Sequence, residues 1–227
     1  MTLRYDVLAL ATLFFFGLAW LYRRDQARSR TIRRATLEPC AALLEDAERD
    51  IDRAGFPVLS GRYRGFRVRL ECLVDAVAVR KLPQLLVKVT LLRELPVEGM
   101  FDIMMRAHNV EFYSPAGELP HALRRPANWP EHATLRSDRE DRRELLARLD
   151  PHIGIFDDNK VKELLVTPRG LRIVYRLDEA ERPYYLVLRQ AQFVNDKAEP
   201  ETIRELLDAL IALQGDLAET AGTSAPP

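Results

Sequence analysis

The sequence predicts an α+β protein in which one N-terminal transmembrane helix is followed by a mainly antiparallel sheet with helices packed on it. Three observations lead to this fold class. An uncharged run from Val7 to Tyr22 precedes a basic segment. The segments after Pro57 alternate apolar and polar residues, as half-buried strands do. Several of these segments are joined by short turns, without the regular alternation of strand and helix that a parallel sheet needs.

The first element is the run of sixteen uncharged residues from Val7 to Tyr22. At about 1.5 Å of rise per residue it makes a helix of about 24 Å, which Tyr5 and Asp6 extend towards the roughly 30 Å hydrocarbon core of a bilayer. The run is apolar on all sides, whereas a core helix of a globular protein normally carries a polar stripe. We therefore predict a transmembrane anchor over residues 1–22.

The flanks of this run predict its orientation. Residues 23–35 form a basic juxtamembrane segment, whereas Arg4 on the other flank is opposed by Asp6. The positive-inside rule then places the C-terminal domain in the cytoplasm, at the inner membrane of a bacterium. A cleaved signal peptide with a small-x-small site at 17–19 is the alternative. The residues expected at the membrane interface are Tyr5, Trp20, Tyr22, Arg23, Arg24, Arg28 and Arg30.

The composition argues against several classes of partner. The formal net charge is zero, and without the basic run 23–34 the remainder is acidic, so no nucleic-acid-binding surface is expected. Cys40 and Cys72 stand alone in apolar surroundings, which predicts buried thiols in a reducing compartment. No cofactor is expected, because the sequence has no glycine-rich phosphate loop, no G-x-S-x-G and no H-E-x-x-H.

The α+β domain is expected over residues 36–215, followed by a disordered tail over 216–227. Apolar residues recur every three to four positions over 36–54, between an N-cap at Thr36 and Gly55, which predicts an amphipathic helix. A period of two then predicts strands. These are a strand to about Ser60, strands over 66–74 and 85–92, and one or two strands over 101–114.

The second half of the domain begins with residues 115–136, whose four prolines and weak periodicity predict a long loop that is either functional or mobile. The capping-box pattern Ser137-x-x-Glu140 and a leucine stripe predict a helix over 138–149. The remaining elements follow the same reasoning. They are a hairpin of strands 161–167 and 171–177, a strand over 184–193, and a helix from Pro200 to a stop at Gly215.

Residues 36–114 and 137–215 resemble each other in this pattern. Each would consist of one helix and three strands, so an internal αβββ duplication would place two similar units in one sheet. The alternative is a chance likeness of two amphipathic hairpins, because the identity between the halves is low.

Arginines gather on the predicted strand faces of both hairpins. Arg67 and Arg69 share one face of the first hairpin, and Arg172 and Arg176 share one face of the second. If both hairpins belong to one sheet, these side chains form a common face for an anionic lipid surface or an acidic partner. The alternative is a solvated face whose arginines pair with Glu71, Glu163 and Asp178.

Few residues suggest catalysis or metal binding. His121 and His132 lie in one predicted loop, at a spacing unlike that of metal ligands, so no metal site is assigned. Asp102 and His108 would lie about 20 Å apart on a strand, which excludes a direct acid–base pair unless the chain turns. No catalytic residue is therefore assigned.

These features predict a single-pass membrane protein that acts by binding, as a cytoplasm-facing accessory or scaffolding component of a membrane complex. Tethering raises the effective concentration of the domain for a protein partner in the same membrane and needs no catalytic residue. The alternatives are a membrane-tethered enzyme with a cleft near residues 115–136 and an exported envelope domain. The anchor lacks G-x-x-x-G, so the oligomeric state is not predicted.

Overall fold

The computed structural model describes residues 12–20, 23–24, 35–53, 55–75, 82–106, 111–188, 191 and 193–219. In this part, nine strands form one antiparallel sheet in the order β1-β2-β3-β4-β9-β8-β5-β7-β6. The strands are β1 Glu45–Ile51, β2 Pro57–Tyr63, β3 Phe66–Asp75, β4 Gln84–Leu92, β5 Phe101–Met105, β6 His121–Leu123, β7 Ala133–Ser137, β8 Val161–Thr167 and β9 Gly170–Glu179. The helices are η1 Glu38–Leu43, η2 Pro115–Glu118, α2 Arg143–Leu149, η3 Asp150–Asp157, α3 Arg182–Leu188 and α4 Pro200–Glu219.

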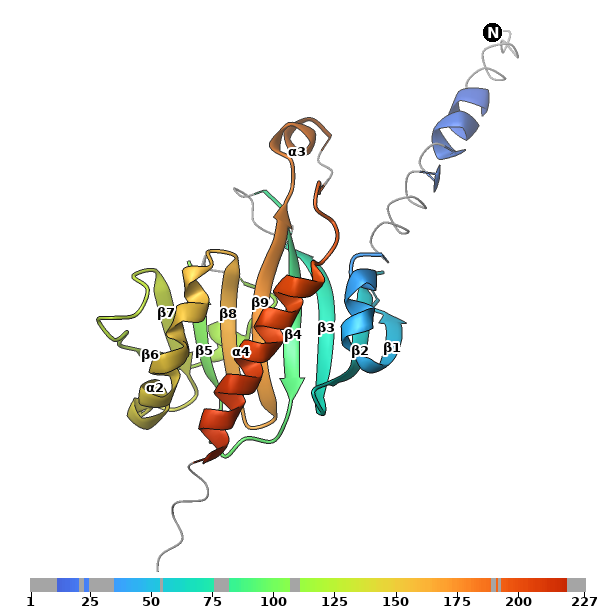
Figure 1. The fold of residues 1–227 in the computed structure, drawn as a ribbon. Helices are drawn as coiled ribbons and strands as arrows, with labels where there is room; N and C mark the ends of the chain where they lie inside the picture. The colour runs from blue at the N-terminus through green and yellow to red at the C-terminus, as the bar shows by residue number, and fades with distance from the viewer. Residues whose placement is uncertain are drawn as a thin grey trace, which may run out of the picture.

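One face of the sheet is covered by α4, which crosses the strands diagonally and contacts η1, α2 and η3 (Figure 1). The core lies between these helices and the sheet. Val87, Val89 and Leu91 of β4 are completely buried, whereas Lys88 and Thr90 between them face the other side. α4 contributes a stripe at helical spacing, made of Ile203, Leu206, Leu207, Leu210, Leu213 and Leu217.

The predicted α+β class with a large antiparallel sheet and helices packed on it is confirmed. Strands predicted over 66–74, 85–92, 161–167 and 171–177 correspond to β3, β4, β8 and β9, and Pro200 begins the last helix. β4 pairs with β9, so both predicted hairpins belong to one sheet. Cys40 and Cys72 are free and buried, as predicted, and burial raises the pKa of Cys40 to about 11.

The helix predicted over residues 36–54 is wrong. Only η1 is helical there, and β1 follows it directly as an edge strand. All residues of β1 except Ala47 are exposed, so its many charged side chains suit an edge that must not pair further. The apolar spacing that suggested a helix reflects Leu37, Cys40 and Leu44, which enter the core from η1 and its flanks.

The strand predicted over residues 184–193 is also wrong, because α3 occupies its first part. Pro183 lies in the first turn of α3, where the backbone N–H groups have no acceptor within the helix, so the N–H that proline lacks is not needed. The stop predicted at Gly215 is wrong as well, since α4 continues to Glu219. Among their described residues, the halves 36–114 and 137–215 therefore do not share the αβββ order of elements, because the first shows no long helix and the second shows no third strand.

Residues 115–136 are more ordered than a long loop. They contain η2, β6 and the first residues of β7. The predicted capping box is wrong, because Ser137 ends β7 and α2 begins only at Arg143, without a side-chain cap.

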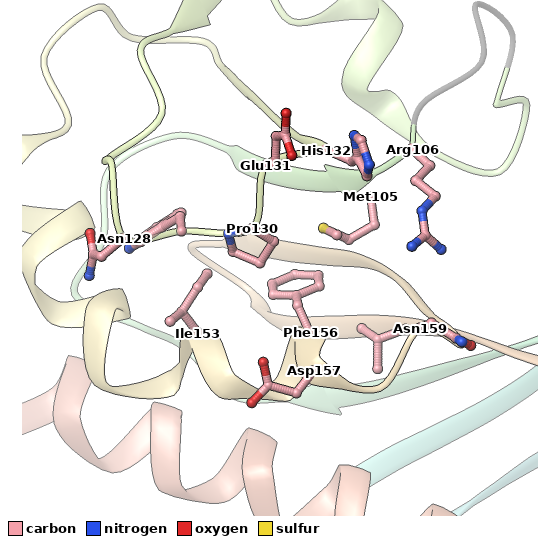
Figure 2. A pocket seen from close by; sticks show the side chains of 12 residues that line it. Met105, Arg106, Asn128, Pro130, Glu131, His132, Ile153, Phe156, Asp157 and Asn159 are labelled. Carbon is pink, nitrogen blue, oxygen red and sulfur yellow. The ribbon is translucent and has the colours of Figure 1, made fainter.

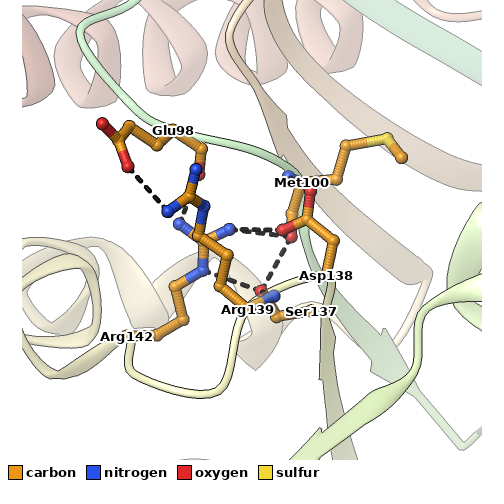
Figure 3. A network of polar contacts seen from close by, with 6 residues as sticks. All are labelled: Glu98, Met100, Ser137, Asp138, Arg139 and Arg142. Carbon is orange, nitrogen blue, oxygen red and sulfur yellow. Dashed lines mark hydrogen bonds and ion pairs between the residues drawn. The ribbon is translucent and has the colours of Figure 1, made fainter.

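Arg142 holds the connection between β4 and β5 against the end of β7 (Figure 3). Its guanidinium donates to Ser137 Oγ at 2.7 Å, to the Met100 carbonyl at 3.2 Å and to the Glu98 carbonyl. It also forms an ion pair with Asp138 at 2.7 Å, and the Arg142 side chain is only 7% exposed. A buried arginine with this many acceptors acts as a structural clamp.

The predicted anchor lies only partly within the described residues. Residues 12–20 are helical, and the side chains of residues 13–16 are 65% to 72% exposed. In the described part of the chain, no helix is both long and apolar enough to cross a bilayer. Residues 1–11, 21–22, 25–34 and 220–227 lie outside the described part. The anchor stays a prediction. The disordered tail predicted over 216–227 is wrong for residues 216–219, which belong to α4, and stays a prediction for the rest.

Candidate functional site

The four arginines of the two hairpins lie on the side of the sheet opposite α4. Arg69 of β3 faces Thr90 of β4, which in turn faces Arg172 of β9, so the register sets these side chains next to one another. Arg67 and Arg176 follow on the same side, two and four residues along their strands. We call Arg67, Arg69, Lys88, Arg172 and Arg176 the basic face.

Exposure and ion pairs divide the basic face into a more exposed end, Arg67 and Arg69, which we call the free end, and a less exposed paired end, Arg172 and Arg176. Arg69 pairs with Glu71 at 3.0 Å and remains half-exposed, and Arg172 pairs with Glu163 at 3.0 Å. Arg176 lies 3.7 Å from Glu179. Arg67 is exposed and has no side-chain partner among the described residues. The end of β3 that carries Arg67 and Arg69 is therefore the part of the face that offers charge to a partner.

Beside the paired end lie two completely buried carboxyls, Asp102 of β5 and Glu163 of β8. Burial, and next the charge of Glu163, raises the pKa of Asp102 to about 9. Asp102 is therefore protonated at neutral pH and hydrogen-bonds Glu163. Asp102 Oδ1 and Glu163 Oε1 are buried and accept no hydrogen bond from another group in the described part, which fits a proton shared between the two carboxyls.

The segment that includes η2 covers this carboxyl pair. Ser114 Oγ donates to Asp102 at 3.4 Å, and an Arg172 Nη donates to the Tyr113 carbonyl at 3.4 Å. Tyr113 is buried against Met104 in a small apolar cluster on this side of the sheet. Because neither carboxyl is exposed to solvent, the pair stabilises the sheet rather than offering a catalytic acid.

A pocket of about 390 Å³ lies where β5 ends and β8 begins, beside the last part of residues 115–136 (Figure 2). Its volume lies within the range of small-molecule sites. Apolar side chains line one part of it, namely Met105, Trp129, Pro130, Ile153, Phe156 and Val161. The polar lining residues are Arg106, Asn128, Glu131, His132, Asp157 and Asn159.

Arg106 and His132 lie together at one side of the pocket, with Met105 and Phe156 beside them (Figure 2). The Arg106 N–H donates to the His132 carbonyl at 3.0 Å, and Arg106 has a φ of 51°, which is unfavourable for a residue other than glycine. Strained backbone of this kind persists only where the surroundings enforce it, and it is common at ligand sites. This part of the pocket therefore presents two basic side chains beside apolar ones.

The structure separates the two histidines of residues 115–136. His132 lines the pocket, whereas His121 lies in β6 and does not. Within the described ranges, no three side chains of His, Cys, Asp or Glu gather where they could hold a metal ion. His108 lies outside the described residues, and the partner of Asp102 is Glu163.

Of the predicted membrane-interface residues, Trp20, Arg23 and Arg24 are described. Trp20 is exposed, and the Arg24 guanidinium lies 5.4 Å from the centre of its ring. Tyr5, Tyr22, Arg28 and Arg30 lie outside the described residues. The assignment of these residues to a membrane interface stays a prediction.

The sequence analysis did not predict the buried carboxyl pair or the pocket. Asp102 and Glu163 each stand inside an apolar strand, in FDIMM and VKELLV, and a charged residue in such a run signals a buried partner. The pocket had no comparable signal, because its lining comes from segments that are distant in the sequence.

Comparison with known proteins finds no matching family model, no matching curated protein and no matching solved structure. The function is therefore inferred from the geometry of the chain itself.

Proposed function

We propose that this chain is a membrane-tethered binding protein, in which a single-pass N-terminal anchor confines the α+β domain to the cytoplasmic side of a membrane. The domain binds an acidic segment of a protein partner through the basic face and acts as an accessory component of a membrane complex. The observation that carries this proposal is the exposed arginine pair Arg67 and Arg69 on the side of the sheet opposite α4.

The position of these arginines favours a protein partner over a lipid surface. The Ala198 N–H donates to the Thr36 carbonyl, and the Asn195 N–H donates to Asp178 near the end of β9. The chain that follows the basic segment 23–35 thus enters the domain at the end of the sheet where β9 stops. Arg67 lies near the opposite end, eight residues before Asp75 of β3, or about 26 Å along the strand. A membrane at the entry end would not reach it.

The test is in-membrane cross-linking of the full-length chain, followed by purification and identification of what is captured. A double variant, Arg67→Glu with Arg69→Glu, reverses the charge of the free end. The matched control, Arg139→Glu with Arg143→Glu, makes the same change in net charge at exposed arginines near α2. Like-charge contacts at an interface cost several kcal/mol, so capture should fall at least tenfold in the first variant only.

Capture should also weaken as salt is raised, because exposed charges are screened. Equal capture by the wild type and both double variants would exclude the basic face as the binding surface. A wild-type chain that captures no protein would contradict the accessory role.

The pocket favours a second function, the binding of a small molecule that has an anionic group and an apolar part. Arg106 and His132 would contact the anionic group, and Phe156 would contact the apolar part. A panel of small aromatic and aliphatic carboxylates, tested by thermal shift on the full-length protein, addresses this function. His132→Ala should abolish a shift that His121→Ala, a histidine outside the pocket, retains. If both variants keep the shift, the pocket is not the site.

A further inference from the structure

α3 is a short helix that projects from the end of the sheet, between β9 and the beginning of α4 (Figure 1). Tyr184 and Leu186 on this helix are 45% and 57% exposed, and Val194 on the returning chain is 68% exposed. Large apolar side chains that gather on an exposed projection favour contact with a partner or a membrane.

This projection adjoins the point where the chain enters the domain. Ala198, four residues after Val194, donates its N–H to the Thr36 carbonyl at 2.8 Å. Cys40 Sγ donates to the carbonyl of the same Ala198 at 3.5 Å. The chain returning from α3 is thus fastened to the residues that directly follow the basic segment 23–35.

The length of the connecting segment keeps this end of the domain near the anchor. From Arg23 to Arg34 there are twelve residues. They span about 18 Å as a helix and at most about 40 Å when extended. Both the entry point and α3 therefore lie within reach of the bilayer that the anchor would occupy.

The chemistry of the projection fits the interfacial region of a bilayer. Tyrosine prefers the headgroup level, where its ring contacts acyl chains and its hydroxyl meets water. Leu186 supplies a purely apolar side chain, and the exposed Arg182 in the first turn of α3 can reach lipid phosphates. A protein partner would need a complementary surface that nothing here specifies, whereas a membrane lies next to this end of the domain by the proposed tether.

We propose that α3, with Val194, forms a second membrane contact that inserts into the lipid headgroup region beside the anchor. This inference rests on the proposed tether. Two points of attachment fix the orientation of the domain, with β9 and its neighbours running away from the membrane. The free end of the basic face then points sideways, at a height of about 26 Å above the α3 end of the sheet, where a neighbouring membrane protein can reach it.

The test measures the depth of single sites in the membrane. Full-length protein carrying one introduced cysteine is labelled with an environment-sensitive fluorophore and placed in nanodiscs of phosphatidylcholine and phosphatidylglycerol that contain nitroxide lipids. Leu186→Cys reports on α3, and Arg169→Cys, in the exposed turn before β9, is the matched control at the opposite end of the sheet. Trp20→Cys reports on the anchor. The native Cys40 and Cys72 are buried, so labelling is confined to the new site.

The expected result is strong quenching at residue 20, at least twofold quenching at residue 186 and none at residue 169. Quenching at 20 with equal, weak quenching at 186 and 169 would overturn the α3 contact and leave the tether intact. Quenching at 186 without quenching at 20 would support the α3 contact and overturn the tether. No quenching at either site would overturn both.

Discussion

Replacing Asp102 by asparagine is expected to remove a large component of the pH dependence of stability. In the folded protein Asp102 is buried beside Glu163, and its pKa is raised from 3.8 to about 9. In the unfolded chain the carboxyl is ionised above about pH 4, so folding takes up a proton at neutral pH. The stability due to this proton is complete below pH 4 and is lost progressively up to pH 9.

The size of the effect follows from the span between the two pKa values. Within this span each pH unit removes about 1.4 kcal/mol of stability, so the wild type should lose about 3 kcal/mol between pH 6 and pH 8 through this group alone. Asparagine has nearly the same shape, donates a hydrogen bond to Glu163 without binding a proton, and does not titrate. The stability of Asp102→Asn relative to the wild type should therefore rise by this amount between the two pH values.

The measurement is urea unfolding of the detergent-solubilised full-length protein at pH 6, 7 and 8, followed by the fluorescence of the buried Trp129 in a Trp20→Phe background. Glu140→Gln, at an exposed position, is the control. Groups that titrate in both proteins cancel in the difference between variant and wild type. A difference that stays constant from pH 6 to pH 8 would show that Asp102 is ionised in the folded state and would refute the assignment of the shared proton.

Three further substitutions test the packing by the same unfolding assay. Arg142→Met removes the cation that pairs with Asp138 and the donor to the Glu98 carbonyl, and should cost about 3–5 kcal/mol. Arg143→Met, at an exposed ion pair, should cost less than about 1 kcal/mol, and equal losses would mean that Arg142 is no clamp. Leu207→Ala removes a completely buried side chain of α4 and should cost about 2–5 kcal/mol, so a loss below this range would place α4 outside the core. Gly170→Ala should cost about 1–3 kcal/mol, because the added Cβ would lie 2.1 Å from the Leu91 carbonyl oxygen at a φ of 149°; an unchanged midpoint would contradict this contact between β4 and β9.

The basic face shows how far the sequence alone can place a surface. The period of two in a strand assigns alternate residues to opposite sides, so the sharing of one side by Arg67 and Arg69, and by Arg172 and Arg176, was predictable. The sequence did not indicate that β4 would stand between β3 and β9, which brings the two pairs together. The alternative that acidic neighbours pair with these arginines holds for Arg69 with Glu71 and for Arg172 with Glu163. The sequence did not indicate that Arg67 would be left without a partner in the described part.

The sequence by itself determined the elements whose periodicity reports burial on one face. β3, β4, β8, β9 and α4 carry such patterns because each buries one side. The four strands were located within two residues at each end, whereas α4 was located correctly only at its start. Only the tertiary structure decided the state of segments whose periodicity was ambiguous. β1 is a strand because β2 offers it an edge. α3 is a helix that projects beyond the end of the sheet, where no strand of the described part is available for it to pair with.

Only the tertiary structure also decided which side chains meet. Asp102 and Glu163 are 61 residues apart and come together because β5 pairs with β8. This pairing depends on the arrangement of all strands in the sheet and cannot be read from either strand alone. The pocket between the end of β5, residues 128–132, η3 and the beginning of β8 arises in the same way. The alternation of side chains along a strand fixes the face of the sheet on which a residue lies. Its neighbours on that face depend on which strands pair, and the free energy of pairing depends on all strands of the sheet together.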